Sequence, residues 1–218
     1  MISTAIRTVV QRVYDRYIRH RLTLTVGSAA GVPVLRPRLF DFTRTDPEYK
    51  QGLIEAIHEH CGGRSVTLVG LGRGVSTVHC LRAGAIHVDA YEASQTMIDI
   101  AQHTFNSCPY EPTDRVSIHH NIVGEAIKIY GDKIGDTLSV SKLPMNDILV
   151  MDCEGAERSI LDSLSSSQLP PTVIVETHPE RGVPTGGTRA QLERLYDTVI
   201  EYDYMASDDR GKRVLVGR

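Results

Sequence analysis

The sequence has 218 residues, of which 41% are hydrophobic and 23% are charged. This length and composition are typical of one globular domain, and the net charge of -3 provides no field for a polyanion, so a nucleic-acid partner is not expected. No apolar run reaches the roughly 18 residues that a membrane span needs, and the first residues lack the apolar core of a signal peptide. We therefore expect no membrane association and a cytoplasmic location.

The first sixty residues predict helices and an irregular connection. Apolar residues recur at helical spacing from Thr4 to Arg21, opposite a row of arginines. This pattern favours a helix packed on the edge of the domain over one that lies on a membrane. The glycines, prolines and small residues between Val26 and Pro37 indicate an irregular connection. A second helix is expected from Pro47 to about His60, with Asp46 as its N-cap.

From residue 65 onward, apolar runs of strand length alternate with segments of helical periodicity. The expected strands are Ser65–Val69, Ile86–Tyr91, Val116–His119, Asp147–Met151, Thr172–Glu176, and a terminal pair, Ile200–Met205 and Arg213–Val216, joined by the turn Ser207–Gly211. The expected helices are Val75–Arg82, Ser94–Phe105, Glu157–Leu164 and Arg189–Tyr196, with Ser94 as an N-cap.

This alternation predicts an α/β fold with a mostly parallel twisted sheet and one antiparallel strand at its C-terminal edge. Residues 1–61 are expected to form an N-terminal helical extension packed on the core, and residues 62–218 the ligand-binding domain. Right-handed crossovers place ligands beyond the carboxyl ends of the strands in such a sheet.

Three glycines, Gly70, Gly72 and Gly74, follow the first strand of this domain and precede a helix. Glycine lets the backbone turn sharply and approach a ligand without a Cβ in the way, and the helix N-terminus offers unpaired N–H groups. The third glycine comes one residue earlier than in the dinucleotide fingerprint, where it would fall at Val75. The spacing therefore favours a ligand without a pyrophosphate, such as S-adenosylmethionine, although a simple strand-to-helix turn also explains it.

Glu92 ends the second strand of the domain, shortly after the glycine loop in the sequence. A carboxylate in this position can accept hydrogen bonds from both hydroxyls of a ribose. Both NAD and S-adenosylmethionine carry an adenosine ribose, so Glu92 does not indicate which of the two ligands binds. The alternative is a surface glutamate that caps the next helix.

Three acidic residues surround the end of the fourth strand, in residues 152–157 (DCEGAE). Acidic groups this close together destabilise the folded state unless they bind a ligand or face solvent. Asp152 or Glu154 could position a substrate, hold a metal or act as a general base. A favourable interaction with the helix dipole instead explains Glu157 well and Glu154 in part. His178, which follows the fifth strand, is either a proton acceptor or a structural loop histidine.

Two adjacent histidines, His119 and His120, follow the third strand of the domain. Adjacent residues on a strand point to opposite faces, which argues against a shared metal ion. We assign no metal-binding residue from the sequence.

Four segments together resemble a known family. They are VGLGRGVST at residues 69–77, YEAS at residues 91–94, DILVMDCEGAERSIL at residues 147–161 and VIVETHP at residues 173–179. On these segments, the chain from about Ser65 to Ala206 resembles the FkbM-type methyltransferases. The hydrophobic-D-x-E-G-A-E run is the most specific of the four.

The resemblance implies a Rossmann-like methyltransferase fold in residues 62–218, S-adenosylmethionine as the methyl donor, and an enzyme that O-methylates a small molecule or a sugar. A small-molecule methyl acceptor is then the expected partner, and a homodimer is compatible with the sequence. The residues that the resemblance implies for the cofactor are Asp152 beside the sulfonium, Gly70, Gly72 and Gly74 at the methionine end, Glu92 at the ribose, and Asn121 and Ile122 near the adenine. The candidate catalytic residues, which would remove the proton of the acceptor, are Asp152, Glu154 and His178.

The chain departs from the family pattern at the glycine loop. Family members usually carry an Asp two residues before the first loop glycine, where this chain has Leu68, and Ala-Asn between the glycines, where it has Leu71-Gly72. Contacts to the methionine amino group would then be rearranged or lost, which leaves open a non-catalytic binding protein with the same fold. A nicotinamide-dependent oxidoreductase shares the fold and Glu92, but the chain lacks the third fingerprint glycine and a Tyr-x-x-x-Lys pair.

Overall fold

The computed structural model describes residues 25–35, 45–109, 111–124, 134–144, 146–165, 168–203 and 211–218, together with Val10 and Val13. Apart from these two valines, the helix expected over residues 4–21 lies outside the described residues, as does the terminal turn apart from Gly211. Within the described ranges, no helix combines the length and the apolar character that crossing a bilayer requires.

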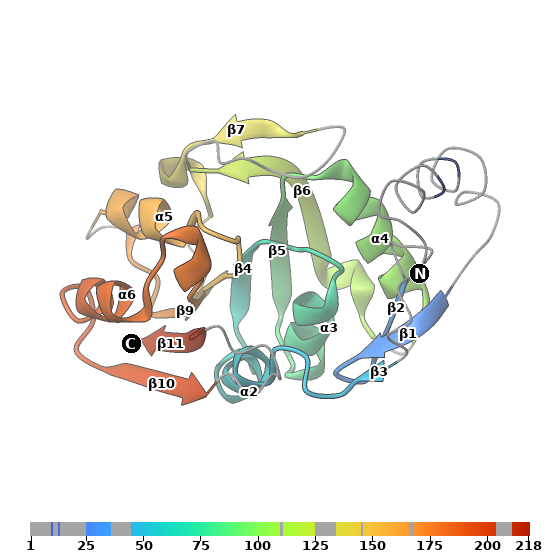
Figure 1. Ribbon diagram of the computed structural model, residues 1–218, viewed down its shortest axis with the longest axis horizontal. Coiled ribbons are helices and arrows are strands. Elements are labelled where there is room, and N and C mark those ends of the chain that lie inside the picture. The colour runs from blue at the N-terminus through green and yellow to red at the C-terminus, as the bar shows by residue number, and fades with distance from the viewer. Residues whose placement is uncertain are drawn as a thin grey trace.

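Strands and helices alternate along the chain, as expected for an α/β fold (Figure 1). The strands of the large sheet are β4 (Ser65–Val69), β5 (His87–Glu92), β6 (Val116–Val123), β7 (Asp136–Leu138), β8 (Ile148–Met151), β9 (Thr172–Glu176), β10 (Val199–Asp203) and β11 (Arg213–Gly217). The α-helices are α2 (Gln51–His60), α3 (Val75–Arg82), α4 (Gln95–Asn106), α5 (Glu157–Ser163) and α6 (Thr185–Leu192). Short 3-10 turns lie in the connections: η1 (Thr113–Arg115), η2 (Val140–Lys142) and η4 (Pro179–Arg181).

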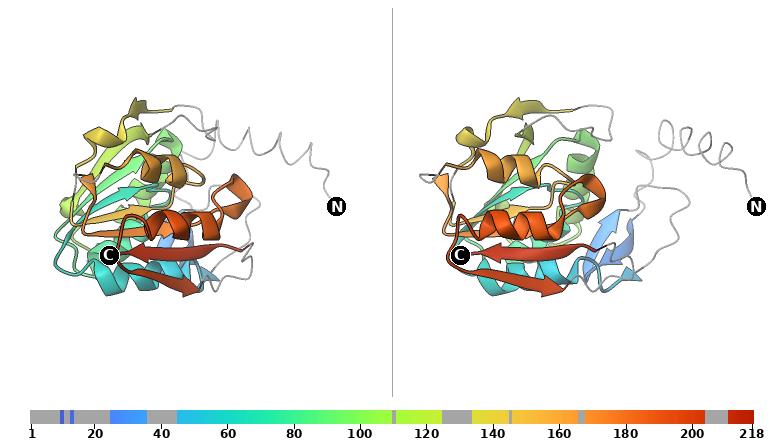
Figure 2. Two further views of the ribbon diagram at one scale, coloured as in Figure 1. Left: turned by 90° about the vertical axis from the view of Figure 1, so that its left-hand side faces the viewer. Right: turned by 60° about the vertical axis from the view of Figure 1, so that its left-hand side comes forward.

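The described strands of the large sheet follow the order β10-β11-β9-β8-β4-β5-β6-β7. Neighbouring strands are parallel except for β11, which is antiparallel to both β9 and β10. Both views of Figure 2 show β10 and β11, in orange and red, running in opposite directions as a pair. The expected antiparallel strand is therefore β11, but it lies one position inside the edge, and β10 forms the edge itself. Strands β5 to β7 lie on one side of β4, and β8 to β11 lie on the other, so the order of the strands reverses between β4 and β8. In open α/β sheets, ligands bind at the carboxyl ends of the strands where this reversal occurs.

Helices cover both faces of the sheet because side chains alternate along its central strands. Leu68 of β4 packs in one hydrophobic cluster with residues of α2, α3 and α4. Val69, the next residue, packs in a second cluster with residues of α5 and α6. Every residue of β8 is buried, which explains its continuous apolar sequence, ILVM. Helices therefore pack on the sheet from both sides.

A small sheet precedes the large one, where an irregular connection was expected over residues 26–37. That expectation was wrong because Gly31, with a φ of 74°, closes a tight turn between two strands rather than interrupting them. Val32 and Val34 alternate into the core, which is the pattern of a half-buried strand. The strands of this sheet are β1 (Thr25–Ala29), β2 (Val32–Leu35) and β3 (Thr45–Asp46), in the order β2-β1-β3.

Helix α2 begins at Gln51 rather than at Pro47, and α6 begins at Thr185 rather than at Arg189. The residue that precedes α2 is Lys50, which has a left-handed backbone with a φ of 49°, so Asp46 does not cap the helix. Residues of α2 share a hydrophobic cluster with β4. The domain boundary at residue 61 stays a prediction.

Candidate active site

A cavity of about 330 Å³ lies at the carboxyl ends of β4, β5, β6 and β8. Its volume falls within the range of small-molecule sites, about 300–1,000 Å³. Of the residues expected at the site, Gly74 and His178 do not line the cavity. The expected residues that do line it are Gly70, Gly72, Glu92, Asn121, Ile122, Asp152 and Glu154.

Gly70 permits the close approach of the strand ends on which the cavity depends. Its φ is 96°, and a Cβ there would come within 2.0 Å of the carbonyl oxygen of Asp152. Gly72 has a φ of 53°, and a Cβ there would meet nothing within 4 Å. The space above Gly72 is therefore open, as a ligand laid along the main chain requires.

Gly74 lies where helix α3 packs against helix α4. It is the N-cap residue of α3, with a φ of 82°, and a Cβ there would come within 2.9 Å of the ring of Phe105. The glycine is needed for the packing of α3 against α4, and its contact with a cofactor stays a prediction.

Glu92 binds the glycine loop directly. Its Oε2 accepts the backbone N–H of Gly72 and its Oε1 accepts that of Ser94, both over 2.9 Å. A carboxylate has about four acceptor positions, so two remain for the hydroxyls of a ribose. Ser94 is the N-cap of α4, as predicted, and its hydroxyl accepts the N–H of Met97 over 3.4 Å.

Asn121 and Ile122 lie on β6 and line the same cavity as Glu92. The side-chain amide of Asn121 donates to the carbonyl oxygen of Asp136 over 3.1 Å, which holds it toward β7. The neighbouring histidines have separate partners: His119 contacts Asp89, whereas His120 contacts the carbonyl oxygen of Ala93.

Asp152 forms an ion pair that the sequence did not suggest. The Nζ of Lys50 lies 2.5 Å from Oδ2 of Asp152 and 3.1 Å from Oε2 of Glu176. The side chains of Lys50, Asp152 and Glu176 are 14%, 9% and 0% exposed, so these charges interact with little screening by solvent. No local pattern around Lys50 marks it as a site residue, because it precedes Asp152 by 102 positions.

The charges around Asp152 set its protonation. Burial, and then the carboxylate of Glu176, raise the pKa of Asp152 to about 7, and the positive charges of Lys50 and His178 oppose this rise. Burial alone would lower the pKa of Lys50, but the two carboxylates outweigh it and hold that pKa well above its ordinary value. Burial would raise the pKa of Glu176, but Lys50 and His178 hold it below its ordinary value. At neutral pH, Lys50 is therefore charged and Asp152 exchanges a proton readily.

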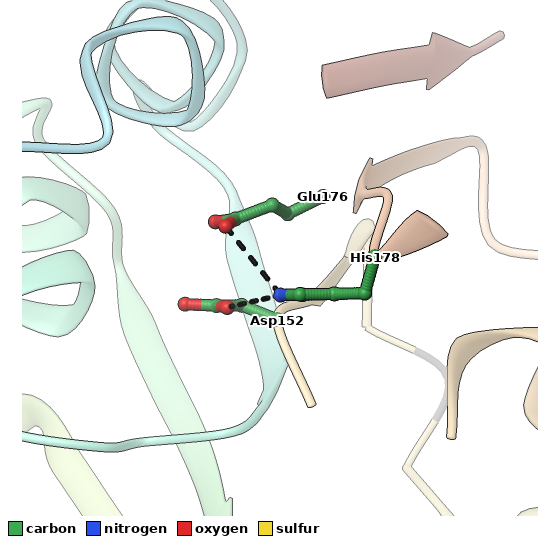
Figure 3. A group of neighbouring side chains, drawn as sticks. All are labelled: Asp152, Glu176 and His178. Atoms are coloured by element: carbon green, nitrogen blue, oxygen red, sulfur yellow. Dashed lines mark ion pairs between the residues drawn. The ribbon is translucent and has the colours of Figure 1, made fainter. Parts of the chain in front are cut away.

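His178 lies behind Asp152 and is only 1% exposed. Its Nε2 faces Oε1 of Glu176 at 3.5 Å and Oδ1 of Asp152 at 3.9 Å (Figure 3). Its Nδ1 lies 2.8 Å from Oε1 of Glu157. Burial would lower the pKa of His178, but these carboxylates, with Glu157 foremost, raise it. His178 thus acts on the charge of Asp152 and does not reach the cavity.

Glu157 holds the loop that follows β8. It is fully buried, and its carboxylate accepts the backbone N–H groups of Cys153 over 3.0 Å and Gly155 over 2.8 Å. Glu154 differs from Glu157: its side chain is 65% exposed, and it lies 3.5 Å from Arg181. Of the three acids, Asp152 and Glu154 therefore line the cavity, and Glu157 supports it.

No protein-family model matches the sequence, and no curated protein matches it with significance. Many solved structures share its fold. A precorrin-6y C5,15-methyltransferase from Geobacter metallireducens is 10% identical, with a TM-score of 0.51 over 79% of this chain and 88% of that one. An O-methyltransferase family protein from Burkholderia thailandensis is 14% identical, with a TM-score of 0.51 over 78% of this chain and 55% of that one.

A third structure, assigned as a methyltransferase and crystallised with S-adenosylhomocysteine (SAH), is 10% identical, with a TM-score of 0.52 over 77% of this chain and 48% of that one. At such low identity the likeness concerns the fold alone. The chain therefore has the Rossmann-like fold of these methyltransferases.

Proposed function

We propose that the protein is an S-adenosylmethionine-dependent methyltransferase that methylates a hydroxyl group of a small molecule or a sugar, in keeping with its resemblance to the FkbM-type enzymes. The observation that carries the proposal is a single cavity that joins the open glycine loop, the carboxylate of Glu92 and the buried carboxylate of Asp152. The fold shared with structures assigned as methyltransferases, one of them crystallised with SAH, supports S-adenosylmethionine as the cofactor.

The cavity fits such a cofactor. The open space above Gly72 accommodates the methionine end, and the free acceptor positions of Glu92 suit the ribose hydroxyls. Asn121 and Ile122 would line the adenine end, which leaves Asp152 for the reactive end. When bound, the cofactor supplies a methyl group that its sulfonium already activates.

The protein then has to orient the acceptor and take its proton. The Asp152 carboxylate, with a pKa of about 7, accepts a proton in the neutral range, where a general base works best. Glu154 lies at the exposed side of the same cavity, where it can orient a polar acceptor. His178 does not touch the acceptor and serves as a positioning residue that stabilises the charge of Asp152. Alignment of acceptor and donor provides much of the rate in such a displacement.

Leu68 motivates a second candidate, a non-catalytic binding protein with this fold. Its side chain is fully buried in the hydrophobic cluster, so it provides no polar group in place of the family's Asp. The cytoplasmic location, the small-molecule acceptor and the homodimer stay predictions.

Ligand binding by the purified chain tests the proposal. We expect SAH and S-adenosylmethionine to raise the melting temperature, since a ligand at 100 times its Kd adds about 2.7 kcal/mol of stability. NAD at the same concentration should have no effect. Binding of NAD alone would favour an oxidoreductase. Binding of SAH without methyl transfer to any of a panel of sugars and hydroxylated small molecules would favour the non-catalytic alternative.

A further inference from the structure

The side chains of Asp152, Glu176 and His178 gather into a cluster whose oxygen and nitrogen atoms lie within 4.8 Å of one another (Figure 3). Two carboxylates and one imidazole form a ligand set typical of divalent transition metals. Oδ1 of Asp152, both carboxylate oxygens of Glu176 and both ring nitrogens of His178 are buried and make no hydrogen bond of regular geometry within the described part of the chain. Such a cluster needs a cation, because buried carboxylates are costly without one.

Lys50 provides a cation that contacts both carboxylates. Its Nζ contacts one oxygen of each carboxylate, at 2.5 Å and 3.1 Å, and so lies between the two groups that a metal ion would bridge. The Nζ of a second lysine, Lys212, lies 3.5 Å from Oε1 of Glu176. Lys50 contacts Oδ2 of Asp152 and Oε2 of Glu176, whereas the Nε2 of His178 faces the other oxygen of each carboxylate. A divalent cation held by the same two carboxylates would lie within a few ångströms of the ammonium group, and two cations this close in a buried site repel each other strongly. The left-handed backbone of Lys50, just before the packed helix α2, fixes the point from which its side chain reaches the cluster.

We propose that the ammonium group of Lys50 bridges the two carboxylates of this site in place of a divalent metal, and that Lys50 therefore positions Asp152 and makes the site metal-independent. The part of Lys50 in methyl transfer rests on the proposed function. Its effect on metal binding rests on the cluster alone. Removal of the ammonium group should convert Asp152, Glu176 and His178 into a divalent-cation site.

The test compares Mn²⁺ binding, measured by electron paramagnetic resonance and calorimetry, between the full-length wild type and Lys50→Met. Methionine keeps an unbranched side chain, one heavy atom shorter than that of lysine, and removes its charge. We expect no saturable binding by the wild type at millimolar Mn²⁺ and an affinity at least tenfold higher in K50M. The double variant K50M/D152N should lose this gain. The control K142M removes an exposed lysine of η2 and should behave like the wild type.

Lys50→Asn is the second variant, because asparagine tolerates a left-handed backbone and so guards against misfolding at this position. A folded K50M or K50N without a gain in Mn²⁺ affinity would overturn the proposal. Saturable Mn²⁺ binding by the wild type that D152N abolishes would also overturn it, and this arm decides the question if neither variant folds. The two proposals fail in different measurements. If the protein does not bind SAH, the proposed function is wrong, but the Mn²⁺ result still tests the role of Lys50.

Discussion

Gly72 donates its backbone N–H to Oε2 of Glu92 over 2.9 Å, and this bond ties the glycine loop to the end of the neighbouring strand. The same carboxylate accepts a second backbone N–H, from Ser94, through its other oxygen. Glu92 therefore organises the loop while it faces the cavity. Cofactor binding and loop conformation should accordingly depend on one side chain.

Glu92→Gln should weaken SAH binding at least tenfold. The amide keeps the size of the side chain but loses its charge and turns one acceptor into a donor, and hydrogen bonds to charged groups contribute about 1.5–3 kcal/mol each. Calorimetric titration with SAH measures the change. Glu193→Gln, an exposed residue outside the cavity, is the matched control and should bind SAH like the wild type. An unchanged Kd for E92Q would remove Glu92 from the cofactor site.

Gly70→Ala should destabilise the fold by more than about 2 kcal/mol, because a left-handed φ costs a non-glycine residue about 1–2 kcal/mol and the Cβ would also collide with the backbone. The collision is with the Asp152 carbonyl oxygen, at 2.0 Å. Urea denaturation measures the loss. Gly63→Ala is the matched control: its φ is 70° and its Cβ would meet nothing within 4 Å, so it should cost only about 1 kcal/mol. Equal losses in the two variants would argue against the close approach at Gly70.

Gly72→Ala should affect binding more than stability. Its Cβ would meet no protein atom within 4 Å, so the added methyl group enters the space proposed for the cofactor. We expect a stability loss similar to that of G63A, with SAH affinity reduced at least tenfold. Unchanged SAH affinity in G72A would place the ligand elsewhere.

The pKa of Asp152 predicts how stability changes with pH. In the folded protein it is raised from 3.8 to about 7, so the folded state binds this proton more tightly than the unfolded state does. The stabilising contribution is fully present below pH 4 and is lost as the pH rises to about 7, by at most about 4 kcal/mol, since each pKa unit corresponds to about 1.4 kcal/mol. The difference in free energy of unfolding between the wild type and Asp152→Asn should therefore fall across this window. A difference that stays constant from pH 4.5 to 7.5 would contradict the raised pKa.

Glu157→Ala should be the most destabilising of the acidic substitutions, by about 3–5 kcal/mol, because it leaves a buried charge without its partner. The orphaned charge is that of His178, and the N–H groups of Cys153 and Gly155 would also lose their acceptor. Chemical denaturation measures the effect. Glu154→Ala removes a largely exposed ion pair with Arg181 and should cost less than about 1 kcal/mol. Similar costs for the two variants would show that Glu157 is not the support of this loop.

The sequence by itself determined the elements whose signals are local. Strand β4 and helix α3 have the predicted bounds, since a short buried strand, a glycine turn and a helical apolar pattern follow one another within a few residues. The N-cap at Ser94 and the position of Glu92 in the cavity were likewise predictable, because capping and the end of a strand depend on neighbouring residues. The small sheet was missed because Gly31 indicates a turn equally well inside a hairpin and inside a loop.

Only the tertiary structure decided which side chains share the site. Lys50 reaches Asp152 because α2 packs beside the strand ends, and Glu176 and His178 join them because β9 lies next to β8. The tertiary structure also showed that Gly72 and Gly74 differ: Gly72 lines the cavity, whereas Gly74 packs against Phe105. These contacts connect residues far apart in the chain, and their distances follow from strand order and helix packing. Local patterns carry no information on either, which is why the cation beside Asp152 could not be predicted.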